Sequence, residues 1–440
     1  MHEGWISRWR GVPLDREDAA RLWMETPENP MIVTALLRLD GALDFATFCE
    51  RVEAAARSRD RLRARVVTPM LPFLRPRWQE EQAASIAHHA DRVRLAPGSG
   101  EPELAEVVSR IANEPLDRAR PLWRMWLVEG DGDRSAIAVR IHHVIADGVA
   151  LLGVLYGFSD EGVEAAPAEP ARAAAVPEPD SAPARRSGEI VRSAVALARL
   201  VTRRSDAPPA LAGRPGGRKA LAWSGPFDVA SLRSAAHRVG AHLNDVILGA
   251  LAGALRILVA QGGAPPRDAL HALVPVALPR AGGALGNRYA SLFVRLPVEI
   301  DGAVERVVAA REAMHEARAA AGVALGRSLV GAAFALREHA EHLGVRVLSR
   351  KASLVVSNLA GPLEPTLHIA GRRIRSIVFA SPTPGSIGVS ASIFSYGGEL
   401  HVTIAVDTAV LPDPWPLVRL FELEMRATLA ALLGAAAGEA

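Results

Sequence analysis

Hydrophobic and polar positions along the chain predict a protein that mixes strands and helices throughout its length. Short runs in which apolar residues alternate with polar ones, or follow one another, predict strands at 31–39, 123–129, 135–141, 269–278, 353–358, 388–395 and 399–407. Apolar residues at helical spacing predict helices at 44–58, 103–113, 228–242, 244–261, 304–320 and 415–433. Strands and helices that follow one another in this way indicate a mixed α/β fold.

A polar stretch at 159–217 separates two such halves. Residues 159–184 are rich in Ala, Pro and Glu and nearly lack large apolar side chains, which is typical of a linker. Residues 189–204 have one apolar and one arginine-rich face, and such a helix either lies on an anionic membrane surface or packs on the fold. Because 440 residues exceed what one core usually supports, we expect a first lobe at 1–158, an interlobe segment at 159–217 and a second lobe at 218–440.

Charge and cysteine content exclude several classes of protein. The 51 basic and 48 acidic residues nearly balance, so no basic surface for nucleic acid is indicated. The one cysteine, Cys49, excludes a disulfide framework and a cysteine-based metal site, and no His-Glu-x-x-His motif occurs. The opening residues lack the pattern of a signal peptide and no apolar run approaches the length of a membrane span, so a cytoplasmic protein is expected.

The ten residues IHHVIADGVA carry the strongest chemical signal of the chain. Their pattern, His-His-x-x-x-Asp-Gly, places His142 and His143 where a predicted strand ends. Asp147 and Gly148 follow where an apolar helix is expected to begin. An imidazole takes a proton from a hydroxyl or thiol near neutral pH, so this loop is a candidate acid–base site.

Three residues allow alternative interpretations. Asp147 is four residues from His143 and could orient that ring, as in a catalytic triad. Gly148 permits either a tight turn or a close backbone approach. Asn244 opens the predicted helix at 244–261, where its amide either donates to a charged oxygen of the reaction or caps the helix.

Seven motifs in order along the chain resemble those of the bacterial wax ester synthase/diacylglycerol acyltransferase family. They are 13–15 (PLD) with 29–31 (NPM), 115–123 (PLDRARPLW), 142–148 (HHVIADG), 244–248 (NDVIL), 274–276 (VPV) with 286–287 (GN), 357–362 (SNLAGP) and 395–398 (SYGG). The family belongs to the CoA-dependent acyltransferases, which include chloramphenicol acetyltransferase and the condensation domains of peptide synthetases. Two departures are Pro279 directly before Arg280, and Ala360 in place of a proline.

The resemblance implies two α/β lobes similar to chloramphenicol acetyltransferase, with a substrate tunnel between them. Acyl-CoA would enter the tunnel from one side and the acceptor from the other. The resemblance implies that His143 is the general base, that His142 orients the loop, and that Asp147 pairs with an arginine, for which Arg280 is a candidate. Asn244 is expected in the same catalytic site.

Substrate contacts are expected at Trp123, Asn287, Gly385, Gly388 and Ser390. By resemblance, the last three line the acceptor side near the base, where small residues leave room for an alkyl chain. They could equally be tightly packed between strands. Residues 385–388 lack the Gly-x-Ser-x-Gly elbow of hydrolases, so direct transfer without an acyl-enzyme is predicted.

The predicted function is the esterification of a long-chain alcohol or diacylglycerol by acyl-CoA, which gives wax ester or triacylglycerol. Acyl-CoA is a co-substrate, and no cofactor or metal ion is expected. One alternative keeps the fold but acylates a polyketide, sugar or amine, from CoA or a carrier protein. Another is a non-catalytic protein that binds lipid or coats lipid droplets, although the intact His143 favours an enzyme. The predicted helix at 189–204 offers a peripheral contact with membranes or lipid droplets.

Overall fold

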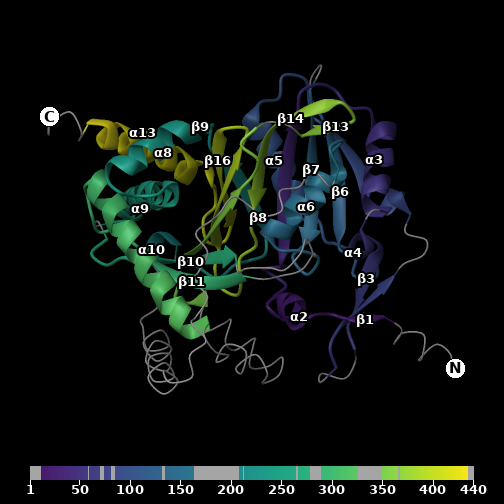
Figure 1. Cartoon of the computed structure of the whole chain (residues 1–440), viewed down its shortest axis with the longest axis horizontal. Coiled ribbons are helices and arrows are strands. Elements are labelled where there is room, and N and C mark those ends of the chain that lie inside the picture. The colour runs from purple at the N-terminus through teal and green to yellow at the C-terminus, as the bar shows by residue number, and fades with distance from the viewer. Residues whose placement is uncertain are drawn as a thin grey trace.

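Two lobes, each built on a β-sheet, lie side by side in the computed structural model of the chain (Figure 1). The structure describes residues 11–57, 59–69, 74–80, 85–130, 134–162, 208–211, 213–263, 266–277, 289–325, 349–364 and 367–434. Three expectations concern residues outside this part of the chain, namely the amphipathic helix at 189–204, Asn287 and Arg280.

A six-stranded sheet in the order β13-β14-β2-β7-β6-β5 forms the first lobe. Its strands are β2 (Ile32–Leu39), β5 (Ala90–Arg94), β6 (Trp123–Glu129), β7 (Ser135–His142), β13 (His368–Ile369) and β14 (Arg372–Ala380). Neighbouring strands are antiparallel, except that β5 and β6 are parallel. Apolar residues of α3 (Phe45–Arg57) and α6 (Gly148–Phe158) pack on one face, and those of α5 (Glu101–Ala112) pack on the other.

Shorter elements adjoin this lobe. A small sheet has the order β1-β4-β3. Its strands and the neighbouring short helices are β1 (Val12–Pro13), β3 (Ala64–Val67), β4 (Arg77–Glu80), α2 (Arg16–Trp23), α4 (Asp60–Arg63) and η1 (Ile86–His88).

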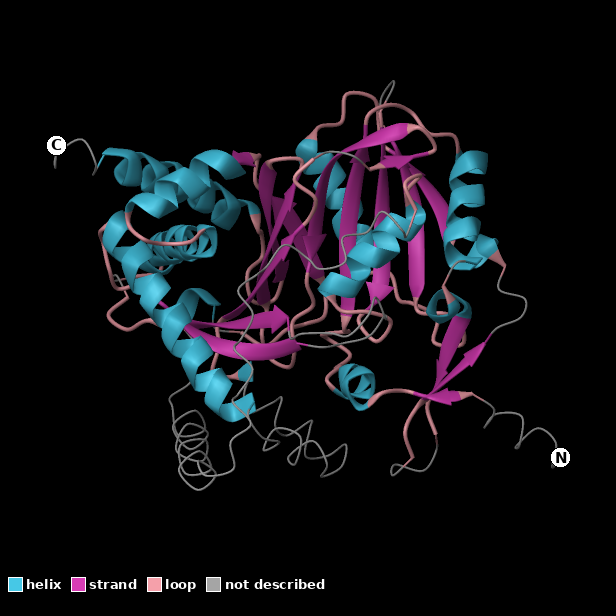
Figure 2. Cartoon of the chain, in the orientation of Figure 1, coloured by secondary structure: helices cyan, strands magenta, loops and turns pink. Residues whose placement is uncertain are grey.

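The second lobe is a sheet in the order β11-β10-β12-β15-β16-β8, with β9 paired to β16. Its strands are β8 (Lys219–Trp223), β9 (Phe227–Asp228), β10 (Leu270–Ala277), β11 (Tyr289–Leu296), β12 (Leu354–Ala360), β15 (Val389–Tyr396) and β16 (Glu399–Asp407). Its helices are η4 (Pro209–Leu211), α8 (Val229–Arg238), α9 (Leu243–Gln261), α10 (Ala303–Leu325) and α13 (Trp415–Gly434). Figure 2 shows the long helices gathered on the side of this sheet that faces away from the first lobe.

Helix α9 is the central helix of the second lobe. Among the described helices it alone is long and apolar enough to cross a membrane, with a mean hydropathy of 1.7 over its most apolar window. This corrects the expectation that no apolar run approaches that length. Because 72% of the window is buried in the second lobe, whose core includes residues of α8, α10 and α13, α9 is a core helix here.

Strands β13 and β14 cross from the second half of the chain into the sheet of the first lobe. β14 lies antiparallel to β2, with Ile377 opposite Leu37 and Ala380 opposite Thr34. The expected second lobe at 218–440 therefore needs a correction, since residues 368–380 complete the sheet of the other lobe. The physical reason is that β14 supplies hydrogen bonds to the edge of β2 that β7 leaves open.

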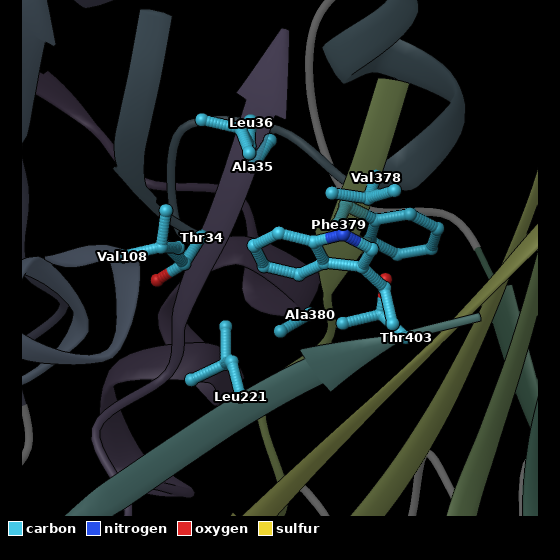
Figure 3. A pocket seen from close by; sticks show the side chains of 10 residues that line it. Thr34, Ala35, Leu36, Val108, Leu221, Val378, Phe379, Ala380 and Thr403 are labelled. Carbon is cyan, nitrogen blue, oxygen red and sulfur yellow. The ribbon is translucent and has the colours of Figure 1, made fainter. Parts of the chain in front are cut away.

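The faces of the two sheets meet in an apolar contact to which Leu36 and Val378 contribute from the first sheet, and Leu221 and Trp223 from β8. A gap too narrow for a water molecule lies between them, and Figure 3 shows the side chains that line it. Thr403 lines this gap, and its buried Oγ1 has no hydrogen-bond partner among the described residues. The sheets therefore meet in a close apolar contact that includes one unpaired hydroxyl group.

Candidate active site

The loop that follows β7 carries both histidines of the motif between a strand and a helix, as the sequence predicts. The backbone nitrogen of His143 donates to the carbonyl oxygen of Met31 at 2.7 Å, which ties the loop to the segment before β2. Asp147 is the N-cap of α6, and its Oδ1 accepts from the backbone nitrogen of Ala150 at 3.0 Å. The loop is therefore fixed at both ends.

His142 is held by both of its ring nitrogens. Its Nδ1 accepts a hydrogen bond from the backbone nitrogen of Val144 at 2.9 Å, and its Nε2 lies 2.6 Å from Oε1 of Glu25. Because Nδ1 accepts, the proton is on Nε2, which donates to the carboxylate. The buried ring thus has no nitrogen with which to take a proton from a substrate, and it holds the loop instead.

Glu25 connects this ring to two other segments. Its Oε1 also accepts from the backbone nitrogen of Met31 at 3.1 Å, and its other oxygen pairs with Arg118. Burial by itself raises the pKa of Glu25, but the hydrogen bonds and charges of His142 and Arg118 outweigh it and lower the pKa. Glu25 is therefore a carboxylate that fixes the position of His142.

The ring of His143 is half-buried and lies beside a residue of the second lobe. The centroid of its ring is 5.6 Å from that of Tyr289, which begins β11. The guanidinium of Arg21 stacks on the same tyrosine, 4.1 Å from its centroid. Burial raises the pKa of Tyr289, against the opposing effect of Arg21, so the phenol stays protonated. His143 thus lies where the two lobes meet.

Gly148 permits a close approach of the second lobe. A Cβ atom at this position would lie only 2.7 Å from Cδ1 of Leu359 on β12. Of the two interpretations open from the sequence, close approach is the one that applies, because the first turn of α6 rests on this leucine. The next residue toward the start of β12, Asn358, donates from its Nδ2 to Oδ1 of Asn244 at 3.2 Å.

Asn244 lies within the first turn of α9, not at its cap. The helix begins at Leu243 and its N-cap is His242, whose backbone nitrogen donates to Oδ2 of Asp245 at 2.8 Å. The cap interpretation of Asn244 is therefore wrong, because Asp245 provides the side chain of the capping box. Asn244 instead bonds to Asn358, next to the leucine that contacts Gly148.

Comparison with known proteins gives two family models that together span most of the chain. The wax ester synthase/diacylglycerol acyltransferase catalytic domain matches residues 14–214, and the C-terminal domain of the same family matches residues 285–428. The chain belongs to the wax ester synthase/diacylglycerol acyltransferase family.

Named relatives agree with this membership, and solved structures share the fold. A Mycobacterium tuberculosis protein named as a diacylglycerol O-acyltransferase is 29% identical over 94% of this chain and 88% of its own length. A second, named likewise from the same species, is 28% identical over 86% of both chains. The wax ester synthase/diacylglycerol acyltransferase of Marinobacter aquaeolei VT8 has a TM-score of 0.68 at 22% identity and covers 96% of this chain and all of its own.

The condensation domain that begins the calcium-dependent antibiotic synthetase has a TM-score of 0.65 at 17% identity, with 96% of both chains covered. Both solved structures lie below 25% identity and support the fold alone. The predicted mixed α/β fold with two lobes is confirmed.

Trp123, in a motif of this acyltransferase family, is a core residue of the first lobe. It is 3% exposed, its ring stacks on His89 at a centroid distance of 4.2 Å, and its Nε1 donates to the carbonyl oxygen of Leu62 at 2.8 Å. These contacts enclose the indole within the protein and are those of a structural residue. The predicted substrate contact of Trp123 stays a prediction.

The small residues predicted on the acceptor side of the acyltransferase have packing contacts. A Cβ atom at Gly388 would lie 2.5 Å from Cγ2 of Val410, so the glycine lets these segments touch. Ser390 is fully buried and its Oγ donates to the carbonyl oxygen of Ser381 at 3.0 Å. Gly385 has a positive φ of 58° in a turn, where a glycine is favoured. For Gly388 and Ser390 the packing interpretation describes the observed contacts.

Sequence reasoning missed four residues around the histidines: Glu25, Asn29, Arg118 and Tyr289. Arg118 lies inside the family motif at 115–123, and Asn29 lies inside the motif at 29–31, so both were quoted without a role. Glu25 is 117 positions from its partner His142, and no local pattern marks such a pair.

Proposed function

We propose that this protein is an acyl-CoA-dependent O-acyltransferase that esterifies a long-chain alcohol or diacylglycerol to wax ester or triacylglycerol. Family membership and relatives named as diacylglycerol O-acyltransferases support the reaction class. The observation that carries the proposal is the loop at 142–148. It holds His143 where the lobes meet, while its neighbour His142 has both ring nitrogens engaged.

In the proposed reaction, the neutral imidazole of His143 takes the proton of the acceptor hydroxyl. The hydroxyl oxygen attacks the thioester carbonyl carbon and forms the new C–O bond. The tetrahedral intermediate then collapses, the C–S bond breaks, and His143 returns the proton to the sulfur of CoA. Such a base contributes roughly 10²–10⁴-fold in rate, and the remainder comes from positioning and from stabilising the oxyanion.

Two further residues would support this base in our proposal. Tyr289 stays protonated, so it adds no negative charge that would hold His143 in its cationic form. Asn244 accepts from Asn358 through Oδ1, which leaves its Nδ2 hydrogens to stabilise an oxyanion in our proposal.

We also propose that the enzyme works in the cytoplasm, takes acyl-CoA as a co-substrate and needs no further cofactor. Within the described residues, no three His, Cys, Asp or Glu side chains are grouped as metal ligands would be. The basic amphipathic pattern at 189–204 supports peripheral contact with membranes or lipid droplets, where its substrates partition.

The test replaces His143 by Ala in the full chain and assays palmitoyl-CoA with hexadecanol, with diacylglycerol and with water alone. We expect ester formation to fall by about 100-fold or more, with an unchanged circular dichroism spectrum, because only a partly exposed ring is removed. His88→Ala, at an exposed histidine of the chain's other histidine pair, is the matched control and should retain wild-type turnover.

Near-normal turnover in His143→Ala would remove the base from the mechanism. Wild-type protein that releases CoA only by hydrolysis, with neither acceptor esterified, would contradict the proposed reaction itself.

A further inference from the structure

The segment at 25–31 contacts both histidines of the loop. Glu25 accepts from His142 and from the backbone of Met31, and the carbonyl of Met31 accepts from the backbone of His143. In the sequence between Glu25 and Met31, the residues Thr26 and Asn29 close a turn through two reciprocal backbone hydrogen bonds of 3.1 and 3.3 Å. Any displacement of this turn is therefore passed on to the loop that carries His143.

Asn29 links the same turn to the second lobe. Its side chain is buried and its Nδ2 donates to the carbonyl oxygens of Gly385 at 2.6 Å and Ile387 at 3.2 Å. Its Oδ1 accepts from Oγ1 of Thr383 at 3.1 Å and from Nζ of Lys219 at 2.5 Å. All four partners lie beyond residue 218, where the second lobe is expected, so this one amide fixes segment 383–387 against the turn beside His143.

Lys219 is itself anchored in the second lobe. Its Nζ lies 2.9 Å from Oδ2 of Asp407, a fully buried carboxylate that also accepts from the backbone nitrogens of Gly216 and Gly217 at 2.8 Å each. Lysine is rare in this chain and occurs only here and at Lys351. The ammonium that Asn29 meets is thus a fixed partner and not a mobile surface group.

The apolar contact between the sheets does not by itself fix how the lobes are aligned. Oγ1 of Thr403, which lines the narrow gap in Figure 3, is buried without a hydrogen-bond partner among the described residues. Nε2 of His401, two residues away on β16, also has no partner in the described part of the chain. Because apolar contacts are non-directional, directional hydrogen bonds such as those of Asn29 determine how the two surfaces are aligned.

We propose that Asn29 is a positioning residue that sets segment 383–387 of the second lobe against the His143 loop, and thereby keeps water from competing with the acceptor hydroxyl. The inference rests on the proposed acyltransferase function. In the competing reaction, the oxygen of water forms the bond to the thioester carbonyl, the C–S bond breaks, and fatty acid and CoA thiol are released. A gap of about 1 Å at this point is enough to misplace reacting groups.

The test measures the partition ratio, which is acyl-CoA hydrolysed per ester formed, with palmitoyl-CoA and hexadecanol. An inactive or unfolded fraction lowers both products equally, so this ratio reports only on the folded enzyme. In Asn29→Asp the two donors to Gly385 and Ile387 are lost while the size is kept. We expect the partition ratio to rise about 10-fold or more. Asn29→Ser, which buries no new charge, should change the ratio in the same direction and serves if the first variant yields too little protein.

Asn113→Ala is the matched control. Asn113 also joins the lobes, since its Oδ1 accepts from the backbone nitrogen of Lys219 at 2.7 Å, but it has no hydrogen bond to the turn at 25–31. Its partition ratio should equal that of the wild type.

An unchanged ratio in both Asn29 variants, or an equal rise in Asn113→Ala, would overturn this inference. The proposed function is judged separately by His143→Ala. If His143→Ala is inactive while the Asn29 variants keep the partition ratio of the wild type, the positioning role of Asn29 is wrong and the proposed function still holds.

Discussion

At the scale of single residues, the site separates into side chains that the motif reveals and side chains that only the fold brings in. His143, Asp147 and Gly148 are local, because a strand, a loop and a helix cap follow one another in the sequence. Glu25 reaches His142 from a segment that precedes β2. Its carboxylate lies against Nε2 of His142 and thereby holds that ring in place.

Replacing Glu25 by Gln keeps the shape of the side chain but removes the charge that pairs with Arg118. We expect the free energy of unfolding to fall by about 1–3 kcal/mol, because a buried hydrogen-bonded charge is lost. We expect kcat to fall roughly 10-fold, since the loop that carries the base loosens. Steady-state kinetics and thermal unfolding measure both. Glu53→Gln, which breaks an exposed pair with Arg57, is the control, and identical behaviour of the two variants would refute the role of Glu25.

Side chains that pair across long sequence distances could not be predicted. Tyr289 meets His143 only because β11 and the loop after β7 come together between the lobes. The burial of Trp123 could not be predicted for the related reason that burial is a property of the packed lobe, and its substrate contact stays a prediction. A motif singles out a residue by its type and position, but it does not tell whether that residue packs or reacts.

At the scale of elements, strands whose residues follow a clear apolar pattern were predicted. Strands in which charged and apolar residues are mixed without such a pattern were not. β2, β6, β7, β15 and β16 agree with the predictions to within about one residue. β14 was missed because three of its first four residues are arginine, and β8 because it is only five residues long. Helix α6 was placed correctly, and its first turn rests directly on β12.

Gly148→Ala would bring a methyl group into contact with Leu359, whose Cδ atoms lie 2.7 and 2.8 Å from the ideal Cβ position. We expect a loss of about 1–2 kcal/mol in the free energy of unfolding from overpacking, together with lower turnover, because α6 and the His143 loop shift as one. Adding Leu359→Ala should restore part of both, since it removes the clashing atoms. Denaturant titration of the two single variants and the double variant tests this, and additive losses would argue against the contact.

At the scale of the whole molecule, the two lobes are held together by an apolar contact between the sheets and by buried polar ties between the lobes. Asp407 is central to these ties. Burial by itself raises its pKa, but hydrogen bonds from Gly216 and Gly217 and the charge of Lys219 outweigh it and lower the pKa below the ordinary 3.8. The two-lobed arrangement was expected from the family resemblance, whereas these ties lay beyond any sequence pattern.

A carboxyl group with a lowered pKa in the folded state stabilises the protein above its ordinary pKa, and this stabilisation is lost as the pH falls. Asp407→Asn should therefore lower the free energy of unfolding by about 3 kcal/mol at pH 7, since it leaves Lys219 without its charged partner. The difference in the free energy of unfolding between the variant and the wild type should become smaller as the pH falls below about 4. Melting curves across this pH range measure it. A difference that stays constant with pH would show that the charge of Asp407 is not the source.

The pairing of β14 with β2, which adds a late segment of the chain to the sheet of the first lobe, has a consequence for how the protein is synthesised. Because β14 pairs with β2, the outer edge of β2 remains open until the ribosome has added residue 380. The amino-terminal lobe therefore cannot finish its sheet on its own while the rest is being translated, although most of it is synthesised first. For the same reason, chimeras that exchange lobes between relatives must transfer residues 367–380 together with the amino-terminal half, however far apart the two stretches lie in the gene.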